Sequence, residues 1–321
     1  MASQRGGDEN GRLEEAARAG WLYYIAGNTQ DQIAVKLGVS RQSAQRLVSL
    51  AISERLIKFE LDHPIARCLS LAAELEQRWG LRLAEVVPTD PEHPDSLVGV
   101  GHATAGHLER HLRSATPLTL GIGTGRTLKA AVDQMSAFDC SQHKVVSMTG
   151  NIAPDGAAAY FSVIYNIADK TKARCYPFPV PVIASSAEER DTLSRQPLIL
   201  SNLRLIEEAE TIFVGVAGVG DDAPLLVDGF LSAADLDALR SAGAVGEITG
   251  WAFDRGGNPI EGLSNARVMS APLPDLATKL CVAVAVGASK VEPLRAALTR
   301  PLVNGLITDE VTAEALLAGG G

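Results

Sequence analysis

The sequence predicts an α/β protein in which a small helical head precedes a larger domain built on a mostly parallel sheet. Three observations predict this fold. Residues 12–62 show short helical patterns with capping residues, and from about residue 82 onward short Val/Ile/Leu runs alternate with helical patterns. Glycine is abundant, with 30 residues in 321, as many strand-to-helix turns require.

Charge is unevenly distributed along the chain. The whole chain carries a formal charge of −9, yet residues 1–60 hold eight Lys or Arg against seven acids, a net of +1. The remainder must then carry −9 − 1 = −10. An acidic body with a locally basic head indicates that only the head meets an anionic partner.

Several classes of protein are excluded by local composition. The start, "MASQRGGDENGRLEEAARAG", has acids where a secretion signal needs a basic end and an apolar run. The longest apolar run, "CVAVAVGA", is far shorter than the ~20 residues of a membrane span. The four cysteines are far apart, without a CxxC pair. We therefore expect a cytoplasmic protein with no membrane partner, no metal site and no disulfide framework, whose first dozen residues are unstructured.

The head pattern predicts three helices. The first follows the apolar positions of "RLEEAARAGWLYYIAG" and ends at Gly27 and Asn28. Thr29, with Gln32 three residues on, forms a capping box that starts a short helix over residues 30–37. "GVS" then makes a tight turn, and Ser40 caps the third helix.

The third helix has a polar outer side. Ala44, Leu47, Val48 and Ala51 repeat at helical spacing and form its buried side. Two short helices joined by a glycine-containing turn form a helix-turn-helix, whose second helix enters the major groove of DNA. Arg can contact guanine or phosphate and Gln can read adenine, whereas an ordinary helical hairpin with a solvated face is the alternative. The expected DNA-contacting residues are Thr29, Ser40, Arg41, Gln42, Ser43, Gln45 and Arg46.

Beyond a connecting helix in "IARCLSLAAELEQRWGL", strand and helix patterns alternate. "PLTLGIG" precedes "TLKAAVDQM", "KVVSMTG" precedes "AAYFSVIYNIAD", and "TIFVGVAGVG" precedes "SAADLDALRSAG". "CVAVAVG" precedes "KVEPLRAAL", and "LVNGLIT" precedes "VTAEALLA". This alternation predicts a Rossmann-like, mostly parallel sheet covered by helices on both faces, with ligands at the carboxyl ends of the strands.

The loop "GIGTGRTLKAA" is the first candidate ligand site. Gly123 and Gly125 allow close approach of the backbone, Thr124 and Thr127 supply hydroxyls, and Arg126 supplies charge at the start of a helix. These groups favour an anion, most simply phosphate. A P-loop would need Gly-Lys-Ser/Thr, and GxGxxG would need glycine in place of Arg126, so nucleotide binding is weakly supported. A tight turn without a ligand is the alternative.

Other polar residues follow further strands. Lys290 precedes a helix and is a second candidate for an anion contact, although a lone lysine is commonly solvated. Asp221, Glu247 and Asp254 lie near strand ends, where carboxylates can hold sugar hydroxyls or can simply be solvated loop acids. His107 and His111 are spaced at i and i+4, but without an HExxH pattern a polar helix surface is the commoner explanation.

The chain resembles the SorC family of sugar-responsive transcriptional regulators over nearly its whole length. In the head the resemblance lies in "LYYIAGNTQDQIAVKLGVSRQSAQRLVSLAISERLIKFEL". Ala44 and Gln45 depart from the family's usual β-branched and short polar residues, which leaves the base preference open. In the body it lies in "GIGTGRT", "MTGNIA", "YPFPVPVIA", "GVAGVG", "GWAFDRGG" and "GLITDEVTAEALL".

This resemblance implies a fold similar to that of sugar-phosphate isomerases and deaminases, with residues 12–62 binding operator DNA and residues 63–321 binding the effector and forming oligomers. It implies a sugar, polyol or sugar-phosphate effector and a dimer or tetramer, with neither a cofactor nor a catalytic residue. The implied effector-binding residues are Gly123, Thr124, Gly125, Arg126, Thr127, Glu247 and Lys290. The alternative is an isomerase-like or deaminase-like enzyme, but an enzyme of that class has no need of a helix-turn-helix.

Overall fold

A computed structural model describes residues 3–54, 56–57, 65–153, 156–159 and 161–319. The chain divides into two compact units, residues 1–64 and residues 65–321, which we call the head and the body. No helix within the described ranges is long and apolar enough to cross a membrane.

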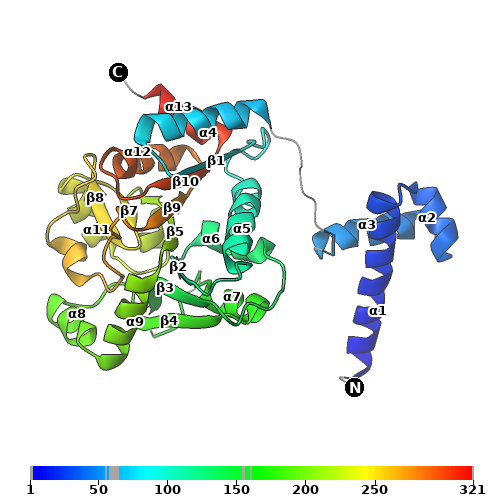
Figure 1. Ribbon diagram of the computed structural model, residues 1–321, viewed down its shortest axis with the longest axis horizontal. Coiled ribbons are helices and arrows are strands. Elements are labelled where there is room, and N and C mark those ends of the chain that lie inside the picture. The colour runs from blue at the N-terminus through cyan, green and yellow to red at the C-terminus, as the bar shows by residue number, and fades with distance from the viewer. Residues whose placement is uncertain (1–2, 55, 58–64, 154–155, 160, 320–321) are drawn as a thin grey trace. The chain divides into compact units, whose positions relative to one another are not determined.

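The head is a small bundle of helices (Figure 1). Alanines at tight contacts and larger aliphatic side chains form its core, which consists of Ala16, Ala19, Ile33, Ala34, Ala44, Leu47, Val48 and Ala51. Its elements are α1 (Ser3–Gly20), the π-helical turn η1 (Trp21–Ile25), α2 (Gln30–Leu37) and α3 (Arg41–Ser53). Each of the three α-helices contributes to this core, so the head buries an apolar centre of its own.

The capping residues begin α2 and α3 where the sequence predicts. Thr29 accepts a hydrogen bond from the Gln32 amide at 3.4 Å, and the Gln32 side chain accepts one from the Thr29 amide at 2.9 Å. Ser40 accepts from the Ser43 amide at 3.1 Å. Gly38 ends α2 with φ of 66°, a conformation that favours glycine. The helix-turn-helix is therefore confirmed, and its boundaries come from local sequence.

The start of the chain differs from the prediction. The first dozen residues were expected to be unstructured, but α1 already begins at Ser3. The reason lies further along the helix, where Ala16 and Ala19 are fully buried against the rest of the head. Packing fixes the helical turn that contains these alanines. Extending the helix from that turn toward Ser3 then costs little free energy, because nucleation is the unfavourable step.

The body is built on a seven-stranded parallel sheet in the order β1-β10-β9-β5-β2-β3-β4. This confirms the predicted α/β class. The strands are β1 (Leu83–Val87), β2 (Thr119–Ile122), β3 (Lys144–Ile152), β4 (Arg174–Pro181), β5 (Thr211–Gly215), β9 (Leu280–Val284) and β10 (Gly305–Asp309).

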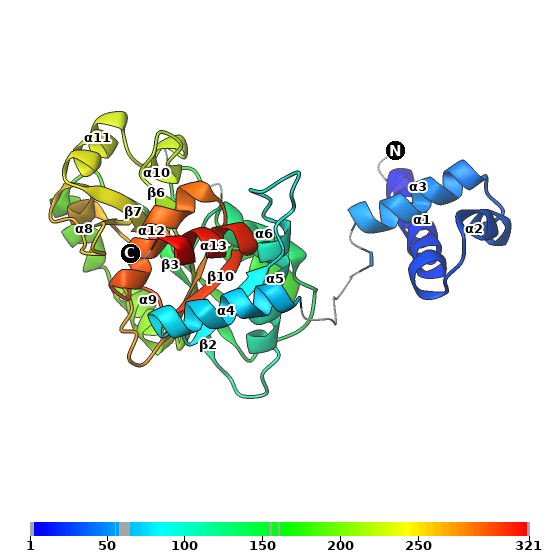
Figure 2. The same ribbon diagram turned by 90° about the horizontal axis from the view of Figure 1, so that it is seen from above.

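Helices cover both faces of this sheet, as Figures 1 and 2 show. Alternate residues of a strand point to opposite faces, so in β5 Ile212 and Val214 pack on one side and Phe213 on the other. The Ile212 side is covered by α4 (Ala66–Trp79), α9 (Pro197–Glu208), α12 (Val291–Thr299) and α13 (Glu310–Ala318). The Phe213 side is covered by α5 (Val98–Leu112), α6 (Arg126–Gln134) and α7 (Ile164–Thr171).

A second, smaller sheet is added to the mostly parallel sheet that the sequence predicts. Its strands β6 (Ala217–Gly218), β7 (Ala244–Ile248) and β8 (Trp251–Asp254) are antiparallel. It is accompanied by short elements, namely α8 (Ala187–Ser194), α10 (Pro224–Val227), α11 (Ala233–Ser241), η2 (Leu263–Arg267) and η3 (Ala288–Lys290). Thr249 and Gly250, both with positive φ, make the two-residue turn between β7 and β8.

One prediction near the end of β3 needs correction. The helix expected over "AAYFSVIYNIAD" begins only at Ile164, because the residues before it fold back onto the end of β3. The Ala159 amide donates to the Asn151 carbonyl at 2.8 Å, and the Asn151 side chain contacts Ser162. β4 contains three prolines, a composition that argues against an inner strand, and it lies at the edge of the sheet where proline is tolerated.

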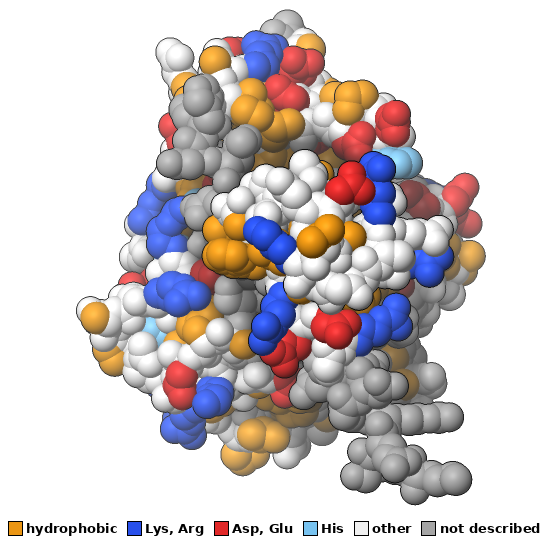
Figure 3. All heavy atoms as spheres, turned by 90° about the vertical axis from the view of Figure 1, so that its right-hand side faces the viewer, with side chains coloured by type: hydrophobic (Ala, Val, Ile, Leu, Met, Phe, Trp, Pro, Cys, Tyr) orange, Lys and Arg blue, Asp and Glu red, His pale blue; other side chains and the backbone are white. Residues whose placement is uncertain are grey.

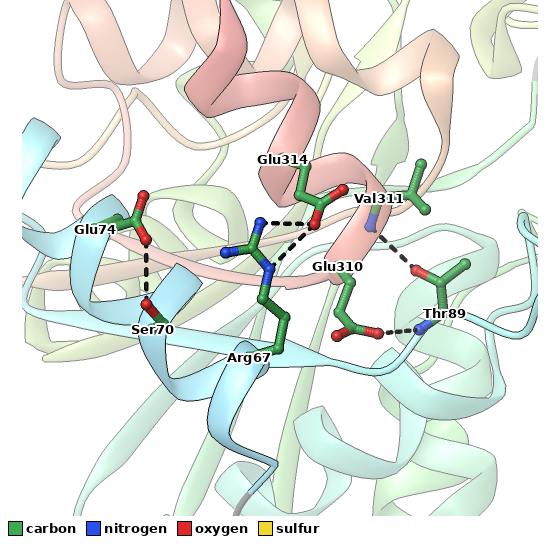
Figure 4. A network of polar contacts seen from close by, with 7 residues as sticks. All are labelled: Arg67, Ser70, Glu74, Thr89, Glu310, Val311 and Glu314. Atoms are coloured by element: carbon green, nitrogen blue, oxygen red, sulfur yellow. Dashed lines mark hydrogen bonds and ion pairs between the residues drawn. The ribbon is translucent and has the colours of Figure 1, made fainter.

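The helix that follows the head in sequence is fixed to the C-terminal helix of the body (Figure 4). Arg67 of α4 donates two hydrogen bonds to Glu314 of α13, at 2.8 and 3.2 Å. Near the start of α13, Thr89 accepts from the Val311 amide and donates its own amide hydrogen to Glu310. The predicted connecting helix is thus confirmed, and it belongs to the body.

Candidate functional site

The outer side of α3 carries the side chains predicted to contact DNA. Arg41, Gln42, Gln45 and Arg46 are all exposed, whereas Ala44, Leu47, Val48 and Ala51 are buried. Arg41 lies 3.4 Å from Asp31, in a pair whose side chains are more than two-thirds exposed, so solvent weakens this contact. Within the part of the chain that the structure describes, Arg46 makes no ion pair. Its guanidinium is available to an external acceptor.

The three hydroxyl residues predicted at the DNA interface also serve the fold. Thr29 and Ser40 are both exposed helix caps, and the Ser43 hydroxyl lies 2.9 Å from that of Ser40. They sit at the N-termini of α2 and α3, where unpaired amides favour a phosphate. The structure therefore brings the seven predicted residues to the two helix starts and to one side of α3.

The surface drawn in Figure 3 mixes charges of both signs. Lys and Arg side chains are spread among Asp and Glu and do not form one continuous basic area. Because charged side chains act mainly within about 8–10 Å at physiological ionic strength, a DNA contact at α3 is governed by nearby basic residues more than by the net charge of the chain.

In the body, the loop after β2 continues directly into α6. The Gly123 amide donates to the Phe213 carbonyl at 2.8 Å, which fixes the loop to β5. Gly125 precedes the first residue of α6 with φ of 119°, a conformation that L side chains rarely adopt. Arg126 and Thr127 are the first two residues of α6, so their amides belong to the helix N-terminus.

Three donor groups of this loop are already engaged within the protein. The Thr124 hydroxyl and the Gly125 amide donate to the Phe161 carbonyl at 2.5 and 3.3 Å. Arg126 donates to Asp228 at 2.7 and 3.4 Å, and its guanidinium lies 4.3 Å from the centre of the Phe161 ring. Hydroxyl, amide and guanidinium donors thus converge, as an anion or hydroxyl site requires, but each has an internal acceptor.

Glu247 and Lys290 form the second part of the candidate site. Glu247 is buried in β7 and accepts a hydrogen bond from the Gly250 amide at 2.7 Å. Burial raises the pKa of Glu247 to about 7, against the opposing effects of the Gly250 amide and the Lys290 charge. The Lys290 charge thus acts on Glu247, and near neutral pH this carboxyl can donate or accept a hydrogen bond.

Residues 215–218 lie between the two parts of the site. The Thr124 carbonyl lies 3.7 Å from the position that a Cβ atom would take at Gly215. Two residues later, Ala217 pairs with Glu247 in the small sheet. The carbonyl of Ser289, the residue before Lys290, lies 3.4 Å from the position that a Cβ atom would take at Gly218. The structure therefore gathers the predicted residues at the carboxyl ends of β2, β5 and β9.

A cavity of about 650 Å³ opens beside Lys290. Its lining includes Gly218, Arg240, Val245, Arg255, Ser289 and Lys290. Its volume is within the range of small-molecule sites. Among the described residues, neither Glu247 nor the loop from Gly123 to Thr127 lines this cavity. Lys290 thus connects the cavity with the buried carboxyl.

The remaining sequence candidates have ordinary structural partners. Asp221 is 96% exposed and pairs with Arg240 at 2.6 Å, while Asp254 accepts the Gly256 and Asn258 amides in a turn. His107 of α5 pairs with Glu85 of β1, the edge strand of the sheet. No group of His, Cys, Asp and Glu among the described residues could hold a metal ion.

Sequence reasoning missed Asp228 and Phe161. Asp228 follows the four-residue helix α10, and Phe161 lies in the segment that was expected to be helical. Each is far from Arg126 in sequence, and no motif marks either. Only the three-dimensional fold brings them to the loop after β2.

Comparisons with known proteins identify the chain. The Sugar-bind family, a sugar-binding domain, matches residues 63–318. The erythritol catabolism regulatory protein EryD of Brucella abortus (strain 2308) is 34% identical over 302 residues, which cover 94% of this chain and 96% of EryD. The transcriptional regulator LsrR of Klebsiella pneumoniae subsp. pneumoniae is 30% identical over 313 residues, 95% of this chain and 93% of LsrR.

The chain belongs to the SorC family of sugar-binding transcriptional regulators. The full-length sorbitol operon regulator SorC from Klebsiella pneumoniae shares the fold, with a TM-score of 0.68 and 21% identity over 95% of this chain and 99% of that structure. The relatives of this SorC-family protein are regulators, and the enzyme alternative is set aside.

The buried carboxyl of this SorC-family regulator predicts a pH-dependent stability. Burial raises the pKa of Glu247 from its ordinary value of 4.5 to about 7, so the folded state penalises its ionised form. Stability should fall as the pH rises from about 4.5 to 7, and Glu247→Gln should remove this loss while keeping the Gly250 contact. Between pH 5 and pH 8 the wild type should therefore lose roughly 2.5 kcal/mol more of its free energy of unfolding than the variant does.

Urea unfolding of both proteins at pH 5 and pH 8 measures this difference. The matched control is Glu261→Gln, at an exposed glutamate, which should follow the wild type. The assignment is wrong if Glu247→Gln and the wild type lose the same free energy of unfolding between the two pH values.

Proposed function

We propose that this protein controls a carbohydrate or polyol catabolic operon by binding operator DNA through residues 12–62 and a small effector through residues 63–321. A helix-turn-helix and a sugar-binding family domain in one chain are the observation that carries this proposal. EryD is an erythritol catabolism regulator, so erythritol is included among the candidate effectors. Because operator DNA is its partner, we infer a cytoplasmic location.

At the DNA, α3 acts as the recognition helix. Arg41, Gln42, Gln45 and Arg46 reach base edges or nearby phosphates from its exposed side. Thr29, Ser40 and Ser43 position the two helix starts, whose free amides can bind backbone phosphates.

At the effector, the loop after β2 binds one end of the ligand. Gly123 and Gly125 let the backbone approach, and Thr124, Arg126 and Thr127 supply donors. Glu247 and Lys290 bind hydroxyls at the other end, next to the cavity of about 650 Å³. Effector binding then changes DNA affinity only as far as the effector prefers one arrangement of the protein over another.

Bonded groups connect the effector loops with the helix that follows the head. The Gly287 amide, three residues before Lys290, donates to Thr312 of α13 at 2.9 Å. Two residues further along α13, Glu314 accepts hydrogen bonds from Arg67 of α4. A shift of the loop after β9 can thus reach the start of α4 through α13, which is the route that we propose for the signal.

Two experiments test this function together. Selection of binding sequences from random DNA duplexes, using the full chain, yields the operator. A thermal-shift screen of free sugars, polyols and their phosphates identifies effectors, because a ligand that binds the folded state raises stability by mass action. The proposal requires a selected DNA sequence and at least one stabilising sugar or polyol, free or phosphorylated; a chain that selects no DNA sequence is not this kind of regulator.

We expect the protein to be a dimer or tetramer. One small head offers too little contact for tight specific binding, so two heads related by a two-fold axis should read a roughly palindromic operator. Its half-sites should lie about 34–36 Å apart, or a multiple of that distance. Light scattering at micromolar concentration and the selected sequences measure both features. A monomer that binds a non-palindromic site tightly would contradict the expectation.

A further inference from the structure

The anion donors of the effector loop face a built-in carboxylate. Asp228 accepts two hydrogen bonds from Arg126, at 2.7 and 3.4 Å. The pair is partly shielded, with 17% of the Asp228 side chain exposed and 40% of the Arg126 side chain exposed. The one positive charge that the loop brings to this end of the site is therefore already balanced.

The position of Asp228 is fixed by the chain around it. It follows α10, and its amide donates to the Pro224 carbonyl at 2.9 Å. Gly229 follows with φ of 75°, which turns the chain directly after Asp228. The Arg126 guanidinium is held in turn by the Phe161 ring. The contact thus joins two positioned side chains.

This arrangement treats charged and uncharged ligands differently. A phosphate at the loop would be a second anion beside Asp228, and like charges repel strongly where solvent is partly excluded. A hydroxyl both donates and accepts a hydrogen bond, so it can bond to Asp228 and to Arg126 or Thr124 together. At the other end of the site, Glu247 and Lys290 again offer a carboxyl group and a positively charged amine.

We propose that Asp228 is a specificity-determining residue that makes the site select an uncharged sugar or polyol over its phosphate ester. This inference rests on the proposed effector function and names the ligand class for it. Carboxylates that hold hydroxyls in a pocket reject analogues that leave a buried charge unpaired or opposed. Asp228 therefore acts both by attracting hydroxyls and by repelling phosphate.

Isothermal titration of the full chain tests the ligand class. The probes are erythritol, ribitol and sorbitol, erythrose 4-phosphate, ribose 5-phosphate and sorbitol 6-phosphate, and inorganic phosphate alone. The wild type should bind its best uncharged ligand at least tenfold more tightly than any phosphorylated one. Asp228→Asn should shift this ratio toward the phosphorylated ligands by at least tenfold, since the opposing charge is gone.

The matched control is Asp191→Asn, which removes an exposed carboxylate from another arginine pair, outside the cavity lining and the loop after β2, and should leave the ratio unchanged. If Asp228→Asn does not fold, Asp228→Ser serves in its place. The ratio of the wild type tests the ligand class by itself and needs no variant. A wild type that prefers a phosphate ester overturns this inference but leaves the effector function intact. An unchanged ratio in Asp228→Asn overturns the role of Asp228. Failure of every probe to bind contradicts the effector function itself.

Discussion

Arg46→Ala should weaken operator binding by the full chain about 10- to 100-fold, while the fold of the head is retained. One bidentate contact of an arginine with a base discriminates by about 1–3 kcal/mol, and each 1.4 kcal/mol is about tenfold in affinity. Arg46 is exposed on α3, opposite the buried Leu47 and Val48, so alanine removes the contact and leaves the core unchanged. Fluorescence anisotropy with the selected operator, at one fixed salt concentration, measures the loss.

A matched control separates this contact from general electrostatics. Arg18 lies in α1 of the same head and pairs with Glu14 at 2.8 Å, with more than two-thirds of each side chain exposed. Arg18→Ala removes the same charge but should retain operator affinity within about twofold, because it lies outside the recognition helix. Equal losses in the two variants, or an unchanged footprint with Arg46→Ala, would remove α3 from the groove.

Arg126→Ala should greatly reduce the response to the effector while operator affinity without effector stays nearly the same. The variant removes the guanidinium from the loop and leaves Asp228 without its partner and Phe161 without its cation contact. Loss of a hydrogen bond to a charged group costs about 1.5–3 kcal/mol, which corresponds to an effector affinity at least tenfold lower. The measurement is titration of operator-bound protein with the effector found in the screen.

Arg113→Ala is the control for this variant because it loses similar contacts elsewhere. Arg113 lies 4.1 Å from the centre of the Phe138 ring and 3.3 Å from Glu109, at the end of α5 and before β2 begins. It should respond to the effector as the wild type does. Matching effector responses in Arg126→Ala and the wild type would show that the loop after β2 is a turn without a ligand.

The sequence could predict those parts of the fold that depend on neighbouring residues. The capping residues Thr29 and Ser40 specify where α2 and α3 begin, and apolar periodicity specifies their buried sides. Alternating strands and helices specify the parallel sheet, and its strand ends specify the edge at which the loops from Gly123 and from Gly287 lie. Each of these features can be read within a window of about ten to twenty residues.

What could not be predicted depends on residues that are distant in sequence. Asp228 and Arg126 are 102 positions apart, and no periodicity links them. β4 is a strand despite its prolines because it lies at the sheet edge, and that place is a property of the whole topology. The segment that carries Phe161 has a helical pattern, but hydrogen bonds to Asn151 hold it against the end of β3. In each case tertiary contacts outweigh local preference.

The most direct test of the central claim is one titration of the full wild-type chain on its selected operator. Fluorescence anisotropy would follow operator affinity as the best sugar or polyol from the thermal-shift screen is added. An effector-controlled regulator predicts a saturable change in operator affinity, typically 5- to 150-fold for a coupling of 1–3 kcal/mol. A ligand that saturates the body and leaves operator affinity unchanged would contradict the claim, because the sugar-binding domain would then exert no control over the head.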